Sequence, residues 1–235
     1  MKFSFTAIGI IHSCYKEKFA VPRQPGLVMD DQTVLELLPP YNRVEALHDI
    51  EGYSHLWIVF VFHANAQDGW KPTVRPPRLG GNRRTGVFAS RSPFRPNPIG
   101  LSLVELSHIG QENGKILLHL KGADLLDGTP VLDIKPYLPY AEALPQARGG
   151  FAAQAPGSDR EVIFTHEADT ACRVREQAGR TDLRRFIIQL LQQDPRPAYA
   201  SEDANRIYGA RLFDFDLKWT ITADRISVIA LEPVR

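Results

Sequence analysis

Residues 86–100 restrict the fold more than any other part of the chain, because they combine two arginines and an asparagine with three prolines. Each proline fixes its own φ and biases the preceding residue toward extended backbone, which restrains Ser92, Arg95 and Asn97. This segment is therefore not expected to form a helix. Such stiffness beside guanidinium and amide groups is typical of a loop that holds a ligand, and a rigid crossover with a structural role is the alternative.

Short segments rich in β-branched and aromatic residues recur through the first half of the chain, separated by turn formers such as Asn113-Gly114. Little helical periodicity lies between them, so the crossover helices of a doubly wound sheet are missing. The pattern predicts a mainly β core, either a barrel or a sandwich, with a central strand at 56–62 that is covered on both faces. The predicted strands are residues 3–11, 56–62, 85–89, 101–106 and 115–120.

The composition changes at residues 144–159, which are rich in alanine, proline, glycine and glutamine without periodic apolar positions. This predicts a first domain (1–145), a linker (146–158) and a small α+β domain (159–235). In the last part an apolar stripe predicts one helix, and alternation predicts three strands, two of them in a hairpin around Ala223-Asp224. These elements are the helix 182–193 and the strands 161–165, 211–222 and 225–231.

The composition also excludes several classes of protein. No apolar run approaches the ~18 residues of a membrane helix, and the N-terminal residues have the pattern of a strand rather than a signal peptide, so we expect a cytoplasmic protein. Cys14 and Cys172 match no metal or redox spacing, which fits two incidental thiols, and a single disulfide is the alternative. The histidines show no converging ligand spacing, so we expect no metal site. Dinucleotide and phosphate-binding glycine motifs are absent.

Charge is distributed unevenly along the chain despite a net charge of +1. No acidic residue occurs between Asp68 and Glu105, a stretch that we call the basic segment. Such a segment favours phosphate-bearing partners, and the preference for arginine over lysine favours nucleic acid. A solvated loop whose counter-charges come from elsewhere in the fold is the alternative. The basic residues are Lys71, Arg75, Arg78, Arg83, Arg84, Arg91 and Arg95.

Two further segments have the composition of ligand-holding loops. Residues 18–26 form a proline-stiffened loop that offers a guanidinium and an amide. Residues 124–137 place three carboxylates around a tight turn, which could bind a ribose diol or a cation, or could cap turns and pair with arginines. His63 ends the apolar strand, a position that is more often structural than catalytic.

Together these segments closely resemble the TsaA-like family, whose bacterial members are tRNA methyltransferases. The resemblance implies a β-barrel methyltransferase that uses S-adenosylmethionine, acts as a homodimer and takes tRNA carrying threonylcarbamoyladenosine as its substrate. The implied product is N6-methylated N6-threonylcarbamoyladenosine beside the anticodon, at position 37 of threonine tRNA. The resemblance rests on residues 22–28, 62–63, 75–82, 86–100 and 127–137, and on residues 194–199, which look like the bacterial form.

Carried over by position, the family's cofactor contacts fall on five short segments of this chain. Ala64 stands where a polar residue would be equally natural, so its contact would come from the backbone or the methyl group. Arg91 suits the cofactor's carboxylate, and the aspartates suit its ribose hydroxyls or ammonium. The implied contacts are Pro22, Arg23, Gln24, His63, Ala64, Arg91, Leu101, Asp124, Leu125, Leu126 and Asp127.

The target nitrogen is a weak nucleophile because its lone pair is delocalised, so an acceptor for its N–H would assist the reaction. Asp133 and Asn97 are the candidates for this catalytic role, and positioning without a dedicated base is the alternative. Phe94 and Tyr137 could stack on a base or belong to the core. The candidates for RNA contact are Arg75, Arg78, Arg83, Arg84, Arg95, Arg196 and Tyr199.

Two other functions are compatible with these residues. The chain could be a non-catalytic RNA-binding β-barrel module whose arginines read phosphates and shape. It could also methylate a different RNA or small molecule on the same fold.

Overall fold

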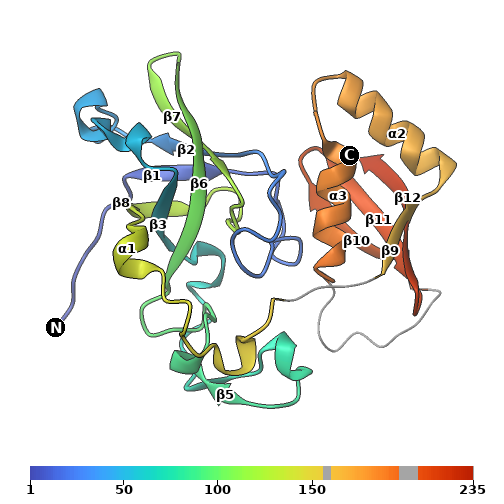
Figure 1. Cartoon of the computed structure of the whole chain (residues 1–235), viewed down its shortest axis with the longest axis horizontal. Helices are drawn as coiled ribbons and strands as arrows, with labels where there is room; N and C mark the ends of the chain where they lie inside the picture. Colours follow the sequence, from blue (N-terminus) through green and yellow to red (C-terminus); the bar gives the residue numbers. More distant parts are fainter. Residues whose placement is uncertain (156–159, 196–205, 235) are drawn as a thin grey trace.

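The computed structural model describes residues 1–155, 160–195 and 206–234, and it contains two separate sheets (Figure 1). Six antiparallel strands of the first sheet form a closed barrel in the order β1-β2-β7-β6-β3-β8. Alternating side chains explain this sheet, since one face of each strand is buried. The strands are β1 (Gly9–His12), β2 (Thr33–Leu37), β3 (His55–Val61), β6 (Ile99–Glu112), β7 (Lys115–Lys121) and β8 (Pro130–Pro136).

The barrel interior is a single apolar cluster. Ile11, Leu35, Leu56, Ile58 and Leu118 are fully buried there. Gly100 of β6 lies against the Phe60 ring, and a Cβ at Gly100 would meet that ring at 2.2 Å. The close approach of the two strands therefore depends on glycine at this position.

The mainly β class is confirmed, and the predicted strands differ from the observed ones mainly at their ends. Residues 3–11 were predicted as one strand, but β1 begins only at Gly9, and Phe3 and Phe5 are exposed. Pairing starts at Ile8, whose N–H donates to the Val131 carbonyl and whose carbonyl accepts from Leu38. Strands β2 and β8 were missed because polar outward-facing residues shorten their apolar pattern.

Residues 62–98 leave the barrel between β3 and β6 and form the excursion at the bottom of Figure 1. The strand predicted at 85–89 is only two residues long and pairs with another short strand, after which a 3-10 turn follows. That turn precedes Pro93, so the prolines do not prevent it, and residues 86–100 contain no α-helix. The excursion comprises η3 (His63–Asn65), β4 (Thr73–Val74), η4 (Pro77–Leu79), β5 (Thr85–Gly86) and η5 (Val87–Ala89).

Short helical turns occupy other connections of the first unit. Helix α1 (Pro139–Glu142) follows the barrel, and its Glu142 accepts a 2.9 Å hydrogen bond from the Trp57 indole. The remaining turns are η1 (Val44–Leu47), η2 (Ile50–Gly52) and η6 (Gly150–Ala152).

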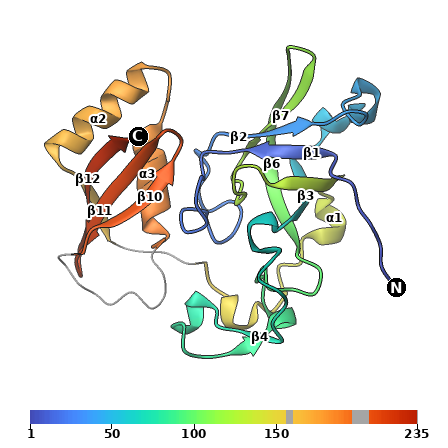
Figure 2. The same cartoon turned by 180° about the vertical axis from the view of Figure 1, so that it is seen from behind.

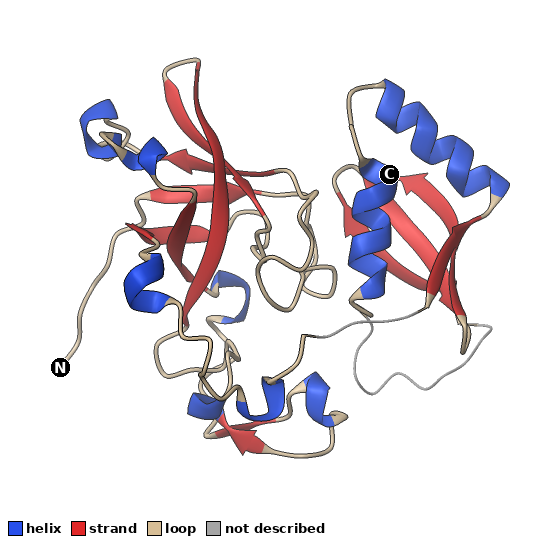
Figure 3. Cartoon of the chain, in the orientation of Figure 1, coloured by secondary structure: helices blue, strands red, loops and turns tan. Residues whose placement is uncertain are grey.

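The second sheet has the order β10-β11-β12-β9 and carries two helices (Figure 3). The predicted helix is present as α3, and the predicted hairpin is present as β11 and β12. Residues 211–222 were predicted as one strand, but they divide at Phe213, whose φ is +50°. The elements are β9 (Glu161–Phe164), α2 (His166–Gln177), α3 (Leu183–Gln192), β10 (Tyr208–Leu212), β11 (Phe215–Ile221) and β12 (Arg225–Pro233).

Helix α2 was missed because only Ala168 and Cys172 among its residues are buried, so the apolar stripe is weak. Its start signal is local: the Thr165 hydroxyl caps the helix by accepting from Ala168 N at 3.2 Å. Glu167 and Asp169 then lie in the first turn, where negative charge is favourable.

The core of the second unit includes residues from the N-terminal part of the chain. Cys14, Tyr15, Ala20 and Val28 are buried in the same cluster as the apolar face of α3. The connection from β1 to β2 therefore lies between the barrel and the second sheet, as both views show (Figures 1 and 2). Cys14 is one of two buried cysteines, and neither forms a disulfide within the described chain. No helix in the described ranges is long and apolar enough to span a membrane.

Candidate functional site

Hydrogen bonds bring several of the predicted cofactor residues together, although they come from distant parts of the sequence. Arg91 donates from Nη1 to Gln24 Oε1 at 2.6 Å, which joins the basic segment to the loop after β1. Lys18 of the same loop donates from Nζ to the Ala64 carbonyl at 2.6 Å. Loop 13–32 thus contacts both the η3 turn and the segment that follows η5.

Asp124 is the acidic group of this assembly. Its carboxylate accepts a 2.5 Å hydrogen bond from Ser102 Oγ on β6, next to Leu101. Burial raises the Asp124 pKa to about 6, while the Ser102 hydrogen bond and the positive charge of Arg91 oppose the shift. Arg91 therefore acts on both Gln24 and Asp124.

The turn after Asp124 is fixed against the end of β1. Asp127 pairs with Lys16 at 2.7 Å and accepts from Ser13 N at 2.9 Å. Ser13 Oγ in turn donates to the Leu125 carbonyl at 2.8 Å. The Leu125 side chain is fully buried in the barrel, so this residue offers only its backbone to a ligand, and Leu126 beside it is partly buried.

Asp31 anchors the other end of the loop and was not singled out from the sequence. Its carboxylate accepts from Gly122 N at 2.5 Å, Ala123 N at 3.2 Å and Thr33 Oγ1 at 2.6 Å. Burial raises the Asp31 pKa to about 6, and these hydrogen bonds oppose the shift. The signal in the sequence is an aspartate two residues before a threonine at the start of an alternating strand.

Glycine is required at position 122, where the end of β7 lies against the loop between β1 and β2. Its φ is +70°, and a Cβ there would lie 2.9 Å from Met29 Sδ and 3.3 Å from Gly26 Cα. Gly26 N also donates to the Gly122 carbonyl at 2.8 Å. The loop that carries Pro22, Arg23 and Gln24 is therefore held against the strand end that precedes Asp124.

His63 lies two residues beyond the end of β3, as the first residue of η3, and is partly buried. Loss of solvent lowers its pKa, and the nearby positive charge of Lys18 lowers it further. The imidazole is therefore neutral near pH 7, which suits a hydrogen-bonding role rather than a cationic one.

The two catalytic candidates lie in different places. Val59 pairs with Leu101 on β6 and with Asp133 on β8, so these three residues form one row on the outer face of the barrel. Asp133 pairs with Lys135 at 2.8 Å and accepts from Ile134 N at 2.9 Å. Asn97 is exposed in the proline-rich segment. Among the described residues, no hydrogen bond or ion pair joins either candidate to Arg91 or Asp124.

The predicted RNA-contacting arginines of the basic segment are mostly exposed, and none forms an ion pair with a described carboxylate. Arg75 and Arg83 have no hydrogen bond to any described residue. Arg84 donates to Thr73 Oγ1 at 3.4 Å, and Arg78 donates to the Gln154 carbonyl. Arg95 differs, because it donates to the Ser90 and Val87 carbonyls at 2.7 and 3.2 Å and so holds its own loop. Two candidates, Arg196 and Tyr199, lie outside the described residues.

Different aromatic residues are available for stacking than the sequence indicated. Tyr137 packs edge-on against His55 and Trp57, and Lys71 covers the Phe94 ring at 4.1 Å. Phe88 and Trp70, by contrast, are 74% and 56% exposed. Both belong to the excursion that carries the arginines.

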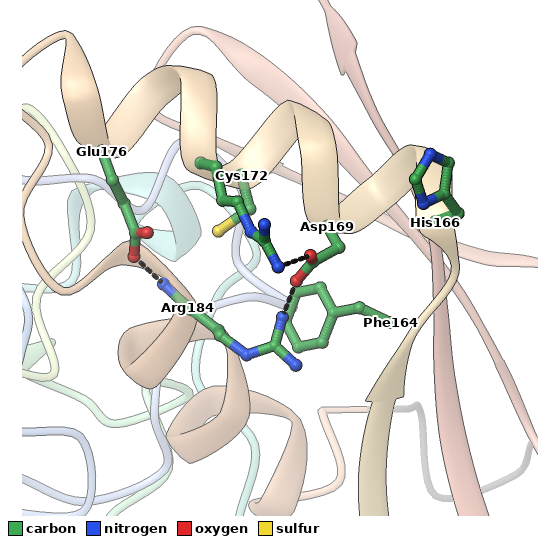
Figure 4. Close-up of a pocket in the computed structure, with 7 residues that line it drawn as sticks. Phe164, His166, Asp169, Cys172, Glu176 and Arg184 are labelled. Atoms are coloured by element: carbon green, nitrogen blue, oxygen red, sulfur yellow. Dashed lines mark hydrogen bonds and ion pairs between the residues drawn. The ribbon is translucent and has the colours of Figure 1, made fainter.

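A cavity of about 540 Å³ lies in the second unit, away from all these residues (Figure 4). Arg184 crosses it to contact Asp169 and lies 4.1 Å from the Phe164 ring centroid, while its backbone N–H donates to Glu176 at 3.0 Å. Arg173 pairs with Asp169 at 2.7 Å. The charged groups therefore satisfy one another, and the cluster joins α2 to α3. Its lining residues are Phe164, His166, Asp169, Cys172, Arg173, Glu176 and Arg184.

Comparison with known proteins identifies the family. Residues 10–143 match the model of the tRNA-methyltransferase O N-terminal domain, and residues 158–234 match that of the TrmO C-terminal domain. The chain belongs to the tRNA-methyltransferase O family. It is 52% identical over 232 residues to the tRNA (adenine(37)-N6)-methyltransferase of Escherichia coli K12, with 98% of each chain covered. It is also 50% identical to a putative S-adenosylmethionine-dependent methyltransferase, RcsF, of Pseudomonas aeruginosa, with 93% of each chain covered.

The fold agrees with this membership of the tRNA-methyltransferase O family. The crystal structure of TrmO from P. aeruginosa superimposes with a TM-score of 0.81 at 43% identity. All of this chain and 98% of that one are covered. The resemblance predicted from the sequence motifs is thereby confirmed.

Proposed function

We propose that this protein is an S-adenosylmethionine-dependent methyltransferase that methylates N6 of N6-threonylcarbamoyladenosine at position 37 of threonine tRNA. The observation that carries the proposal is the 52% identity, over 98% of both chains, to the E. coli tRNA (adenine(37)-N6)-methyltransferase. A mouse tRNA (adenine(37)-N6)-methyltransferase matches 133 residues of this chain at 46% identity.

The residues gathered around Arg91 have the chemistry that the cofactor requires. Its guanidinium can bind the carboxylate of the cofactor in a bidentate manner. Asp124 is a largely buried carboxylate with no cation in ion-pair contact among the described residues, so it can accept from an ammonium or a ribose hydroxyl. Gln24 and the backbone groups of Pro22, Arg23, Ala64 and the 124–127 turn complete the proposed set. When bound, S-adenosylmethionine supplies an electrophilic methyl group.

The basic segment provides the proposed RNA surface. Arg75 and Arg83 are exposed, have no hydrogen bond or ion pair with a described residue and can neutralise phosphates, while Arg78 and Arg84 each have one hydrogen bond to a described residue. Phe88 and Trp70 belong to the same excursion, are exposed and can stack on unpaired bases. An anticodon loop offers such bases, because its nucleotides are already single-stranded.

In the reaction the N6 nitrogen would form a bond to the methyl carbon as the sulfonium–methyl bond breaks, which leaves a neutral thioether, and the N–H proton would pass to an acceptor or to solvent. Asp133 or Asn97 would accept a hydrogen bond from that N–H as the nitrogen rehybridises. Asp133 is partly held by Lys135 and the Ile134 amide, which fixes its direction. Orientation of the two reactants supplies the remainder of the rate enhancement.

The proposal extends to the organisation of the molecule. Residues 1–145 form the cofactor-binding β-barrel domain, 146–158 the linker and 159–235 the small α+β domain. The protein acts as a cytoplasmic homodimer without a metal ion. Exposed apolar side chains on the first unit, including Phe3, Phe5 and Tyr140, support self-association. Light scattering of the purified protein tests the dimer, and a monomeric mass would contradict it.

Transfer of a labelled methyl group to tRNA tests the proposed reaction. Transfer is expected to tRNA from cells that make the threonylcarbamoyl group and not to tRNA from cells that lack it. A non-catalytic RNA-binding module would show no transfer to either, and its melting temperature would not respond to S-adenosylmethionine. Transfer to both tRNAs would instead indicate a different methylated nucleoside.

A further inference from the structure

We propose that helix α3 of the second unit positions the cofactor-binding loop, and that Arg185 and Gln189 are the positioning residues. The inference rests on the proposed function, because the loop carries Pro22, Arg23 and Gln24. The second unit would then contribute to cofactor binding indirectly, through the loop, without contacting the cofactor itself.

The loop needs external support because it has no regular structure of its own. Residues 13–32 connect β1 to β2 through bends and turns. Ala20 and Val28, on either side of the predicted contacts, are buried in the core of the second unit. A segment without internal strand or helix pairing takes its conformation from such anchors.

Two side chains of α3 bind the same end of the loop. Gln189 Oε1 accepts from Met29 N at 2.9 Å, and its Nε2 donates to Asp30 Oδ2 at 2.8 Å. Arg185 contacts both oxygens of the Asp30 carboxylate. Arg185 and Gln189 are four residues apart, so they share one face of the helix. The Asp30 side chain is only 12% exposed and Arg185 is 61% exposed, so the Asp30 carboxylate is fixed by the two-point contact with Arg185 together with Gln189 rather than by a buried ion pair.

The anchored residues continue directly into the rest of the site. Asp31 follows Asp30 and binds the amides of Gly122 and Ala123, which precede Asp124. Five residues before Met29, Gln24 accepts from Arg91. A shift of the loop at Met29 and Asp30 is therefore transmitted to both Gln24 and the Asp124 turn.

The second unit makes another contact with the same loop at Arg23, which donates to the Asp194 carbonyl at 3.3 Å. Asp194 lies just beyond the C-terminus of α3. Helix α3 and Asp194, two residues beyond its end, thus contact the loop on both sides of Gln24.

Adjacent arginines of α3 provide a matched experiment. Arg185→Ala removes the contact with Asp30, whereas Arg184→Ala removes an ion pair of similar exposure that lies within the second unit. The dissociation constant for S-adenosylmethionine is measured by calorimetry without RNA, and amide hydrogen exchange of residues 20–31 is measured in the ligand-free protein. Melting temperatures of both variants show that each remains folded.

Arg185→Ala and Gln189→Met are expected to weaken S-adenosylmethionine binding about tenfold and to accelerate exchange at Met29 and Asp30. The KM for S-adenosylmethionine rises while kcat stays within about twofold, and Arg185→Lys recovers part of the affinity. Arg184→Ala changes neither the affinity nor the exchange of the loop.

Equal cofactor affinities in Arg185→Ala, Arg184→Ala and the unchanged protein would overturn the positioning role. Failure of the proposed function has a different signature. In that case the unchanged protein binds S-adenosylmethionine, Arg185→Ala binds it more weakly, and neither transfers a methyl group to tRNA.

Discussion

The arginines of the two units differ in their partners. In the second unit Arg173, Arg180, Arg184, Arg185 and Arg211 each form an ion pair with an aspartate. In the basic segment, the arginines have no carboxylate in ion-pair contact among the described residues. The first group stabilises contacts within the protein, and the second leaves positive charge available to an anionic ligand. The number of arginines in a unit does not distinguish these two roles. What distinguishes them is whether an acidic side chain lies close enough to each arginine to form an ion pair.

Arg91→Ala is expected to have the largest effect, because Arg91 contacts Gln24 and acts electrostatically on Asp124. Loss of a charge-assisted hydrogen bond of about 1.5–3 kcal/mol corresponds to a fall in S-adenosylmethionine affinity of roughly ten- to hundredfold. Calorimetry in the absence of RNA measures the dissociation constant for S-adenosylmethionine. Arg43→Ala, which breaks an exposed pair with Glu45, is the control and should leave the affinity unchanged. If the two variants lost the same amount of S-adenosylmethionine affinity, Arg91 would belong with the arginines that only stabilise contacts within the protein.

Asp124→Asn should weaken cofactor binding about tenfold and also change how stability depends on pH. The folded-state pKa is about 6, against an ordinary value of 3.8, so the folded protein binds the proton more tightly. The stability contributed by Asp124 is therefore greatest below about pH 4 and is lost as the pH rises through 6.

Asparagine at position 124 removes this titration. The variant should be more stable than the unchanged protein at pH 7.5, by roughly 1–3 kcal/mol. Urea unfolding at pH 4.5 and pH 7.5 measures the difference. A variant that is less stable at pH 7.5 would show that the charged form of Asp124 is stabilised in the fold.

Phe88→Ala tests whether exposed aromatic groups of the basic segment add to its charge. Stacking on one base is worth about 1–3 kcal/mol, and at the low end of that range, about 1–1.4 kcal/mol, the affinity for an anticodon stem-loop should fall roughly five- to tenfold at constant salt. Phe88→Trp should retain the affinity. Tyr41→Ala removes an exposed ring outside the basic segment and should have no effect. A loss of dimer mass in Phe88→Ala, with RNA affinity unchanged, would place Phe88 in a subunit contact instead.

Arg83→Ala should have the smallest effect, about threefold on RNA affinity, because one exposed phosphate contact is lost. The slope of log affinity against log salt should decrease by about one, with cofactor affinity unchanged. Arg173→Ala, taken from the paired group, should alter neither quantity. An unchanged salt slope in Arg83→Ala would remove Arg83 from the RNA surface.

The mainly β class and the motifs of the site could be predicted from the sequence because both are local signals. A continuous apolar run located β3, alternation located β6 and β7, and an apolar stripe located α3. Helix α2 buries little, and β8 carries Asp133 and Lys135 on its outer face, so neither shows a regular apolar period.

Contacts between distant segments could not be predicted in this way. The Asp30–Arg185 contact joins residues 155 positions apart, and Asp31 gains its role only when the strand end at Gly122 folds beside it. Arg95 shows a local contact that was also not predicted, because its guanidinium donates to carbonyls of its own loop.

Nucleoside mass spectrometry of threonine tRNA shows whether this protein methylates threonylcarbamoyladenosine. Purified protein is incubated with S-adenosylmethionine and tRNA that carries threonylcarbamoyladenosine, and the nucleosides are released and analysed. We expect the threonylcarbamoyladenosine signal to decrease as a species heavier by one methyl group appears, and Arg91→Ala to slow this conversion. An unchanged threonylcarbamoyladenosine signal, with active protein that binds the cofactor, would contradict the account.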